Sequence, residues 1–164
     1  YRNGIVDGYD SRLHYTSDWI YDNVKKKILS EASQRLGGIS ETKTIDFMTT
    51  HRTAYRLLKT DDQMLERIRN IEGEINARGG FYYLPKEKLE SAKVDIPHMA
   101  MIAFTTSIKG LDTTHTGFAY KKDGKLTFIH ASSAKNIVVI DEKTLSDYCK
   151  TQKKCTGITV MLVR

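Results

Sequence analysis

Two histidines, His115 and His130, lie on short apolar runs that flank the sequence Asp123-Gly124. An Asp-Gly pair between strand-like runs is typical of a tight β-hairpin, because both residues tolerate positive φ angles. In such a hairpin His115 lies near the start of the first strand and His130 near the end of the second. Antiparallel pairing therefore brings both imidazoles to the same end of the ribbon. The spacing therefore predicts a histidine pair, and the pattern alone fits a structural role as well as a catalytic one.

A histidine pair has a defined chemistry. A neutral histidine is the usual general base near physiological pH, and a polar partner on its second nitrogen fixes its tautomer and orientation. We interpret His115 as the candidate base and His130 as its orienting partner. Gly117 leaves room for close approach of a substrate or of another backbone. Such a pair still needs a nucleophile from another element.

Cys149 and Cys155 are the only cysteines in the sequence. Their spacing fits either a small disulfide loop, in an oxidising compartment, or two free thiols. Either thiol is a candidate nucleophile, but Cys149 falls on the apolar side of an expected helix, which is typical of a buried thiol. A zinc site that combines the cysteines with the two histidines lacks the usual ligand spacing. A metal site formed by the histidines and Asp112 is a further alternative.

Helix signals occupy the first part of the chain. Apolar residues recur at helical spacing from about Ser17, over residues 46–58, and after a T-x-x-Q capping box at Thr60. The third helix is expected to stop at Gly79. His51 lies on the apolar side of the second helix, where a hydrogen-bonded place at the edge of the core is expected.

Beyond Pro97 the apolar runs have the length and composition of strands. The expected strands are 99–106, 116–120, 126–130, 137–140 and 158–163. One helix, beginning at Thr144, interrupts them, and a short strand at 81–84 with a helical turn at 86–91 precedes them. Helices followed by a largely antiparallel sheet favour an α+β fold. Because no linker or repeat divides the chain, residues 1–164 are expected to form one domain.

Composition is that of an ordinary globular protein, with 164 residues, 40% hydrophobic and 28% charged. No apolar run is long enough to span a membrane. The net charge of +6 suits an anionic partner, but the basic residues are scattered, so we expect a solvated surface and no nucleic-acid partner. Because the chain opens on Tyr1 rather than Met, we expect a processed or truncated product, whose lack of a signal peptide says nothing about destination.

Three segments carry a resemblance to a known family. They are residues 9–20 (YDSRLHYTSDWI), 110–118 (GLDTTHTGF) and 129–133 (IHASS). They resemble the N-acetylmuramoyl-L-alanine amidase-like family of bacterial cell-wall hydrolases, within the NlpC-type papain-like superfamily of cysteine hydrolases, and the likeness runs from Tyr1 to Arg164. The resemblance implies a papain-like α+β fold with N-terminal helices packed on a largely antiparallel sheet. It also implies hydrolysis of the amide bond between N-acetylmuramic acid and L-alanine in peptidoglycan.

The resemblance further implies roles for single residues. His115 matches the catalytic histidine of the family, and His130 matches its orienting residue. A loop expected near the substrate contributes Arg12, His14, Tyr15, Asp18 and Trp19. Arg12 is the expected partner of a substrate carboxylate or lactyl oxygen. We expect a peptidoglycan or muropeptide ligand, no metal or cofactor, and export to the bacterial periplasm or cell surface, where a disulfide can form.

Two departures from the family pattern affect these expectations. The nucleophilic cysteine of the family begins a helix upstream of the segment that matches Tyr1, so this chain is expected to lack it and to be inactive alone. Met99-Ala100 stands where the family usually carries Gly-Asp, so the following strand is expected to enter differently. These departures favour a second hypothesis, a non-catalytic module that binds peptidoglycan fragments.

Overall fold

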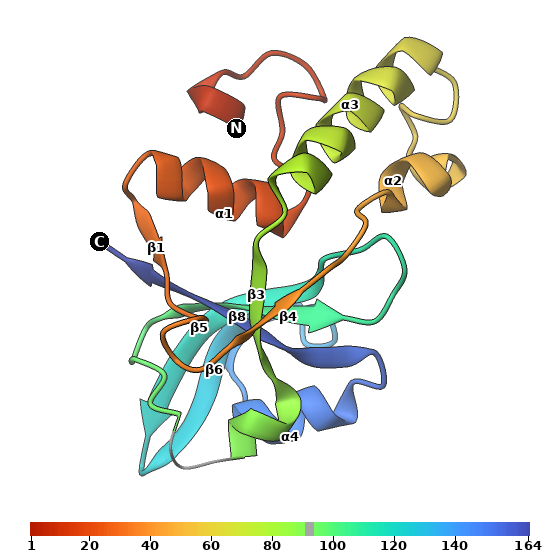
Figure 1. Ribbon diagram of the computed structural model, residues 1–164. Helices are drawn as coiled ribbons and strands as arrows, with labels where there is room; N and C mark the ends of the chain where they lie inside the picture. The colour runs from red at the N-terminus through yellow and green to blue at the C-terminus, as the bar shows by residue number, and fades with distance from the viewer. Residues whose placement is uncertain (91–93) are drawn as a thin grey trace.

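The computed structural model describes residues 1–90 and 94–164. Its helices in chain order are η1 (Arg2–Gly4), α1 (Thr16–Lys25), α2 (Phe47–Thr50), η2 (Arg52–Ala54), α3 (Asp62–Arg78), η3 (Lys86–Glu90) and α4 (Leu145–Thr151). Its strands are β1 (Leu29–Glu31), β2 (Ile39–Glu41), β3 (Phe81–Pro85), β4 (Met101–Thr106), β5 (Thr113–Lys122), β6 (Lys125–Ser132), β7 (Ile137–Ile140) and β8 (Cys155–Val163). Figure 1 shows α1, α2 and α3 on one side of the sheet and α4 on the other. None of the described helices is long and apolar enough to cross a membrane.

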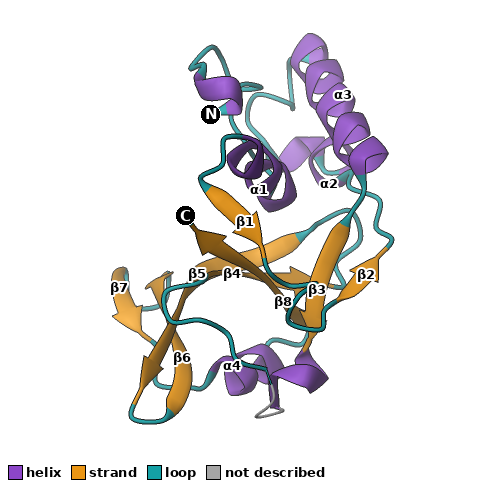
Figure 2. Cartoon of the chain, turned by 60° about the vertical axis from the view of Figure 1, so that its left-hand side comes forward, coloured by secondary structure: helices purple, strands orange, loops and turns teal. Residues whose placement is uncertain are grey.

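All eight strands join one sheet, and every ladder between described strands is antiparallel. The order along its main path is β2-β3-β8-β4-β5-β6-β7, with β1 paired to β8 outside that path. The last strand of the chain, β8, therefore lies between β3 and β4 in the interior of the sheet. Figure 2 shows the sheet curving so that α4 lies against its inner side. The predicted mixture of helices with a large antiparallel sheet is confirmed.

Three apolar clusters hold the layers together. The first lies between the sheet and α4 and includes Phe104, Phe128 and Leu145. The second lies between α2, α3 and the loop before α1 and includes Met48 and Ile68. The third joins α1 to the sheet, where Trp19 packs against Met101 and its buried neighbours. The first and third clusters place apolar side chains between the sheet and the helices α4 and α1, and burial of these side chains stabilises the fold.

The first and third predicted helices are confirmed as α1 and α3, but the cap of the third differs from the prediction. At α1 the N–H of Ser17 donates to the carboxylate of Asp112, 2.7 Å away, and the Ser17 side chain is not the cap. At α3 the cap is Asp61, whose carboxylate accepts the N–H of Met64 at 2.8 Å, in place of Thr60. An ionised carboxylate also complements the positive end of the helix dipole, which a threonine hydroxyl does not.

The helix predicted over residues 46–58 is wrong, because only the short elements α2 and η2 form there. The hydroxyl of Thr50 donates to the carbonyl oxygen of Asp46 at 2.7 Å, a bond that competes with the helical backbone pattern. His51 is exposed and stacks on Phe47, with ring centroids 4.1 Å apart. The predicted hydrogen bond to a neighbour is present, since Nδ1 of His51 lies 3.0 Å from the carbonyl oxygen of Phe47, but the predicted place at the edge of the core is wrong.

The strands expected after Pro97 are present, and the short strand expected at 81–84 is β3. The strands β1 and β2 were not predicted, because each has three residues and no alternation of polar and apolar side chains marks them. Helices therefore do not simply precede the sheet. The helical turn predicted at 86–91 is η3, and Ser91 lies outside the described residues.

The chain enters β4 through a tight turn at Met99, whose φ is 62°. The N–H of Met99 donates to the carbonyl oxygen of Ala119 at 2.7 Å, and the N–H of Ala119 donates to the carbonyl oxygen of Ala100 at 2.8 Å. This left-handed region favours glycine, because a Cβ atom is crowded there. The Met99-Ala100 departure thus places a bulky residue in a backbone conformation that suits glycine.

Candidate active site

The predicted hairpin is formed by β5 and β6. Lys122 and Lys125 pair across the turn. Asp123 and Gly124 fill the turn with φ angles of 50° and 73°. Two consecutive positive φ angles match the right-handed twist of the flanking strands, and this keeps the hairpin in register. The Asp-Gly signal in the sequence therefore identified the turn correctly.

The same hairpin brings the two histidines together at its open end. Nε2 of His115 lies 2.8 Å from Nδ1 of His130, and the two ring planes are nearly perpendicular at 87°. A Cβ atom at Gly117 would lie 3.3 Å from Cβ of His130 and 2.6 Å from the carbonyl oxygen of Ile129. The glycine therefore permits the close approach of β6 that the pair needs. The predicted histidine pair is confirmed as a hydrogen-bonded unit.

A third group, Asp141, extends this pair, and no prediction from the sequence included it. Nε2 of His130 lies 3.1 Å from Oδ2 of Asp141. Asp141 directly follows β7, and its N–H donates to the carbonyl oxygen of Phe128 on β6 at 2.9 Å. The one sequence signal that could have identified Asp141 is its position, because it is an acidic residue directly after the strand that follows the second histidine.

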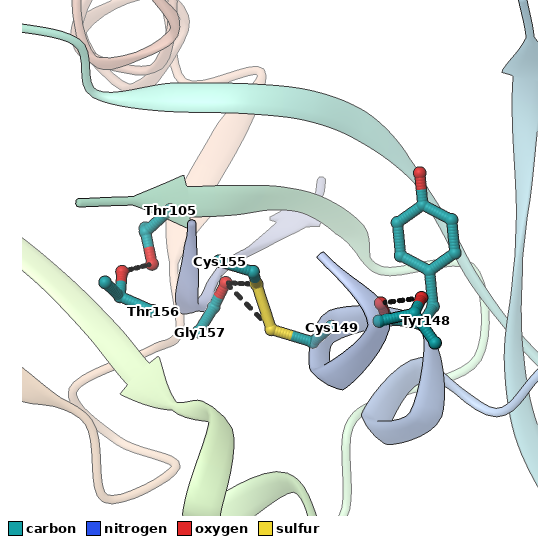
Figure 3. The surroundings of a disulfide bond; sticks show 7 residues. Thr105, Tyr148, Cys149, Cys155, Thr156 and Gly157 are labelled. Carbon is teal, nitrogen blue, oxygen red and sulfur yellow. Dashed lines mark hydrogen bonds between the residues drawn. A yellow bond between two sulfur atoms is a disulfide. The ribbon is translucent and has the colours of Figure 1, made fainter. Parts of the chain in front are cut away.

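Aromatic rings surround the histidines and remove water from them. Phe128 stacks on His130 with centroids 4.4 Å apart, and Tyr148 lies 6.1 Å from His115. Figure 3 shows Tyr148 projecting from α4 on the side away from the disulfide. Burial, followed by the charge of His130, lowers the pKa of His115 below 6.5, while Asp141 acts in the opposite direction. This lowering favours the neutral form of His115, which is the form that a base requires.

A groove of about 720 Å³ opens beside the pair. The loop before α1 and the first turns of α1 form one wall, and β5, β6 and β7 contribute the other. His14 and Trp19 line this groove together with His115 and His130. The structure thus gathers four of the seven residues predicted for the site around one open space.

His14 has one nitrogen engaged by the backbone. Because a carbonyl oxygen can only accept, Nε2 of His14 donates to the carbonyl oxygen of Tyr9 at 2.8 Å, and its Nδ1 keeps a lone pair when the ring is neutral. Burial lowers the pKa of His14, and the charge of Arg12 adds to this effect. Arg12 itself is exposed and does not line the groove.

Tyr15 and Asp18, which were also predicted for the site, do not line the groove. Tyr15 is buried, its hydroxyl donates to Glu72 at 2.6 Å, and its oxygen accepts the N–H of Met48 at 2.8 Å. Asp18 is 1% exposed and forms ion pairs with two arginines. The polar atoms of both side chains are used by internal partners, so the structure gives these residues an anchoring role for α1 and its loop.

Asp112 connects α1 to β5. Its Oδ2 accepts the N–H of Ser17 at 2.7 Å and its Oδ1 accepts the N–H of Thr113 at 2.7 Å. The hydroxyls of Thr16 and Thr113 form a further hydrogen bond of 2.6 Å. The carboxylate considered for a metal site is therefore directed at backbone amides. Across residues 1–90 and 94–164, no group of three or more His, Cys, Asp or Glu side chains is arranged to hold a metal.

Cys149 and Cys155 form a disulfide that joins α4 to β8 (Figure 3). Both residues are buried, with exposed fractions of 0% and 3%. The alternative that one of them acts as a nucleophile is therefore wrong for this structure, because neither sulfur is a thiol.

Comparison with known proteins identifies the family of the chain. The model of the N-acetylmuramoyl-L-alanine amidase-like family matches residues 1–158. The chain belongs to this amidase-like family. No curated protein matches it.

Solved structures of similar proteins extend beyond the length of this amidase-like chain. An N-acetylmuramoyl-L-alanine amidase from Bacteroides uniformis ATCC 8492 is 34% identical, with a TM-score of 0.91, and the alignment covers 100% of this chain and 69% of that one. A Bacteroides fragilis protein provisionally named a xylanase is 36% identical, with a TM-score of 0.90 over 98% of this chain and 70% of that one. A Legionella pneumophila protein, 23% identical with a TM-score of 0.68 over 99% of this chain and 65% of that one, shares the fold.

Proposed function

We propose that this chain carries the base and the orienting residue of a cell-wall amidase. The reaction is hydrolysis of the amide bond between N-acetylmuramic acid and L-alanine in peptidoglycan or its fragments. The observation that carries the proposal is the 2.8 Å hydrogen bond between His115 and His130 beside an open groove. Membership of the amidase-like family and the amidase from Bacteroides uniformis support the choice of substrate.

His115 acts as the base through one particular nitrogen. Its Nε2 is occupied by His130, so Nδ1 is left to take the proton of a nucleophile. The thiolate of a cysteine then attacks the carbonyl carbon of the muramoyl lactyl group, and His115 returns the proton to the nitrogen of L-alanine as that amine leaves. Water, deprotonated by His115, resolves the thioester and regenerates the thiolate. This is the papain-like, NlpC-type mechanism that the resemblance implies.

The nucleophile in this proposal is a cysteine outside these 164 residues, at the N-terminus of a helix. Both cysteines of the chain are bonded to each other. A helix N-terminus lowers the pKa of a thiol, because the dipole and the free amides stabilise the thiolate. We expect this thiolate to approach Nδ1 of His115.

The groove supplies the substrate contacts. His14 and Trp19 face it, and Arg12, exposed beside it, offers a planar guanidinium to a carboxylate or lactyl oxygen. Tyr15 and Asp18 hold the loop that presents these residues. A wall substrate and a disulfide together favour export to the periplasm or cell surface.

One observation favours a second function. Because both cysteines of this chain lie in the disulfide, the 164 residues by themselves fit a non-catalytic module that binds peptidoglycan fragments in the groove. The two functions differ in whether bond cleavage depends on His115.

The test follows release of the new amino terminus from a muramoyl-L-alanyl peptide. The 164-residue chain is expected to bind the peptide without cleaving it, and the whole reading frame is expected to cleave it. His115→Ala in the whole protein should lower kcat by about 10²–10⁴, the contribution of a general base. His51→Ala, at an exposed histidine away from the groove, is the matched control and should keep the rate. The wild-type rate should decline with acid through an apparent pKa below 6.5.

Two results would contradict the amidase proposal. One is cleavage by the 164-residue chain that survives His115→Ala. The other is a whole protein that binds the peptide but does not cleave it, which would favour the binding module.

A further inference from the structure

We propose that Asp141 is a positioning residue that sets the tautomers of both histidines and leaves the lone pair of His115 on Nδ1. Its catalytic consequence rests on the proposed function, whereas the tautomers can be measured without any reaction. The proposal follows from a line of three groups, Asp141, His130 and His115, joined by contacts of 3.1 Å and 2.8 Å.

The carboxylate of Asp141 determines which nitrogen donates and which accepts in both contacts of this line. An ionised carboxylate only accepts hydrogen bonds, so Nε2 of His130 must carry the proton in its contact with Asp141. A neutral His130 with its proton on Nε2 has its lone pair on Nδ1, and Nδ1 then accepts from Nε2 of His115. A neutral His115 with its proton on Nε2 has its lone pair on Nδ1. One carboxylate thus specifies both tautomers.

Asp141 is held in place by backbone contacts, so that only one of its oxygens meets the histidine. Its Oδ1 accepts the N–H of Lys143 at 2.8 Å, while Oδ2 points to His130. The hydroxyl of Thr127, which is buried, lies 2.6 Å from the carbonyl oxygen of Asp141 and 2.8 Å from that of Lys143. These bonds tie the segment after β7 to β6, the strand that carries His130.

The surroundings make this contact stronger than those of surface charges. The side chain of His130 is 6% exposed and that of Asp141 is 18% exposed, so water screens their interaction little. Tyr148 of α4 is the titratable group that packs on the histidines from the other side. Charged residues around the exposed side of Asp141 are Lys122, Asp123, Lys125, Glu142 and Lys143.

Asp141→Asn is expected to reverse both tautomers. The N–H of Lys143 would hold the amide oxygen at the Oδ1 position, which places the amide NH₂ against Nε2 of His130. Nε2 must then accept, so His130 carries its proton on Nδ1 and donates to Nε2 of His115. His115 would then carry its own proton on Nδ1, where the base needs a lone pair.

The experiment is long-range ¹H–¹⁵N correlation NMR of the 164-residue protein labelled at histidine nitrogens, at neutral pH. The wild type should show both His115 and His130 protonated on Nε2, and Asp141→Asn should show both protonated on Nδ1. Glu142→Gln is the matched control, because it removes one negative charge next to Asp141 from a side chain that is 89% exposed. It should keep the wild-type tautomers.

A titration followed by the same NMR signals gives a second readout. Asp141 raises the pKa of His115 against the larger lowering effects of burial and His130. Asp141→Asn should therefore lower the pKa of His115 further, and Glu142→Gln should leave it nearly unchanged. In the whole protein, Asp141→Asn should lower kcat by about 10²–10⁴ at neutral pH with little change in KM, by analogy with loss of the tautomer-setting aspartate of serine proteases.

Wild-type His115 protonated on Nδ1 would overturn the proposal without any variant, which covers the case of an Asp141→Asn protein that does not fold. Wild-type tautomers and titration retained in Asp141→Asn would overturn it as well. Reversed tautomers in Asp141→Asn, together with a whole protein that cleaves no muramoyl peptide, would support this inference and contradict the proposed function.

Discussion

Single residues near the site divide into those that face the groove and those that anchor it. Asp18 belongs to the second kind. Its two carboxylate oxygens each lie 2.6 Å from an arginine, Arg2 on one side and Arg78 on the other. Asp18 is 1% exposed, and its removal leaves two guanidinium groups, on side chains that are 23% and 24% exposed, without their shared partner.

Asp18→Asn should therefore lower the free energy of unfolding by about 3 kcal/mol, the usual effect of breaking a buried ion pair. Asp62→Asn is the control, because its side chain is 85% exposed and pairs with Arg52 at 2.7 Å. The control should lose less than about 1 kcal/mol, since surface pairs contribute little. Urea unfolding followed by circular dichroism measures both, and equal losses would mean that Asp18 is not an anchor.

At the scale of elements, the β5–β6 hairpin and the segment after β7 build the line of polar groups. Close packing of β5 against β6 depends on Gly117. A Cβ atom there would meet the carbonyl oxygen of Ile129 at 2.6 Å and Cδ2 of Phe128 at 2.9 Å. Both neighbours lie in β6 and neither is the free end of a flexible side chain, so the strand itself must shift.

Gly117→Ala should lower the free energy of unfolding by about 1–3 kcal/mol through overpacking, and it should displace His130 from His115. Gly73→Ala is the matched control, because no neighbouring atom lies within 4 Å of a Cβ at that position in α3. That variant should gain about 0.5–1 kcal/mol from helix propensity. Chemical denaturation gives the two free energies, and histidine NMR signals report the pair. An unchanged histidine spectrum in Gly117→Ala would contradict the role given to this glycine.

At the scale of the whole molecule, the disulfide connects the helix α4 to the interior strand β8. Cys149 lies on α4, which covers the inner side of the sheet, and Cys155 begins β8, which runs between β3 and β4. α4 also carries Tyr148, which packs on the histidines. The disulfide therefore stabilises a helix that helps to enclose the site.

Reduction of the disulfide should lower the free energy of unfolding by about 2 kcal/mol, the loop-closure value for a ring of this small size. For a chain of this length the melting temperature should fall by about 4–8 °C. The double variant Cys149→Ala with Cys155→Ala contains no cysteine and should not respond to reductant. Thermal melts with and without reductant, checked by thiol labelling, make the comparison. An unchanged melting temperature after complete reduction would contradict this account.

The sequence by itself determined the parts of the site that depend on neighbours in the chain. The Asp-Gly turn predicted the hairpin, and with it the meeting of His115 and His130, because a hairpin fixes its register within a few residues. The family could also be recognised from three short segments. Apolar periodicity found α1, α3 and most strands, but it missed β1 and β2 and overextended the helix near His51, where local threonine bonds compete with helix formation.

Only the tertiary structure decided what depends on contacts between distant segments. The central place of β8 and the burial of Asp18 between Arg2 and Arg78 join residues that no local pattern relates. Asp141 is the clearest case, because its role comes from the pairing of β7 with β6 and not from its own sequence context. Side-chain chemistry in the sequence names what a residue can do, but the partner that a donor or acceptor meets is set by packing over the whole chain.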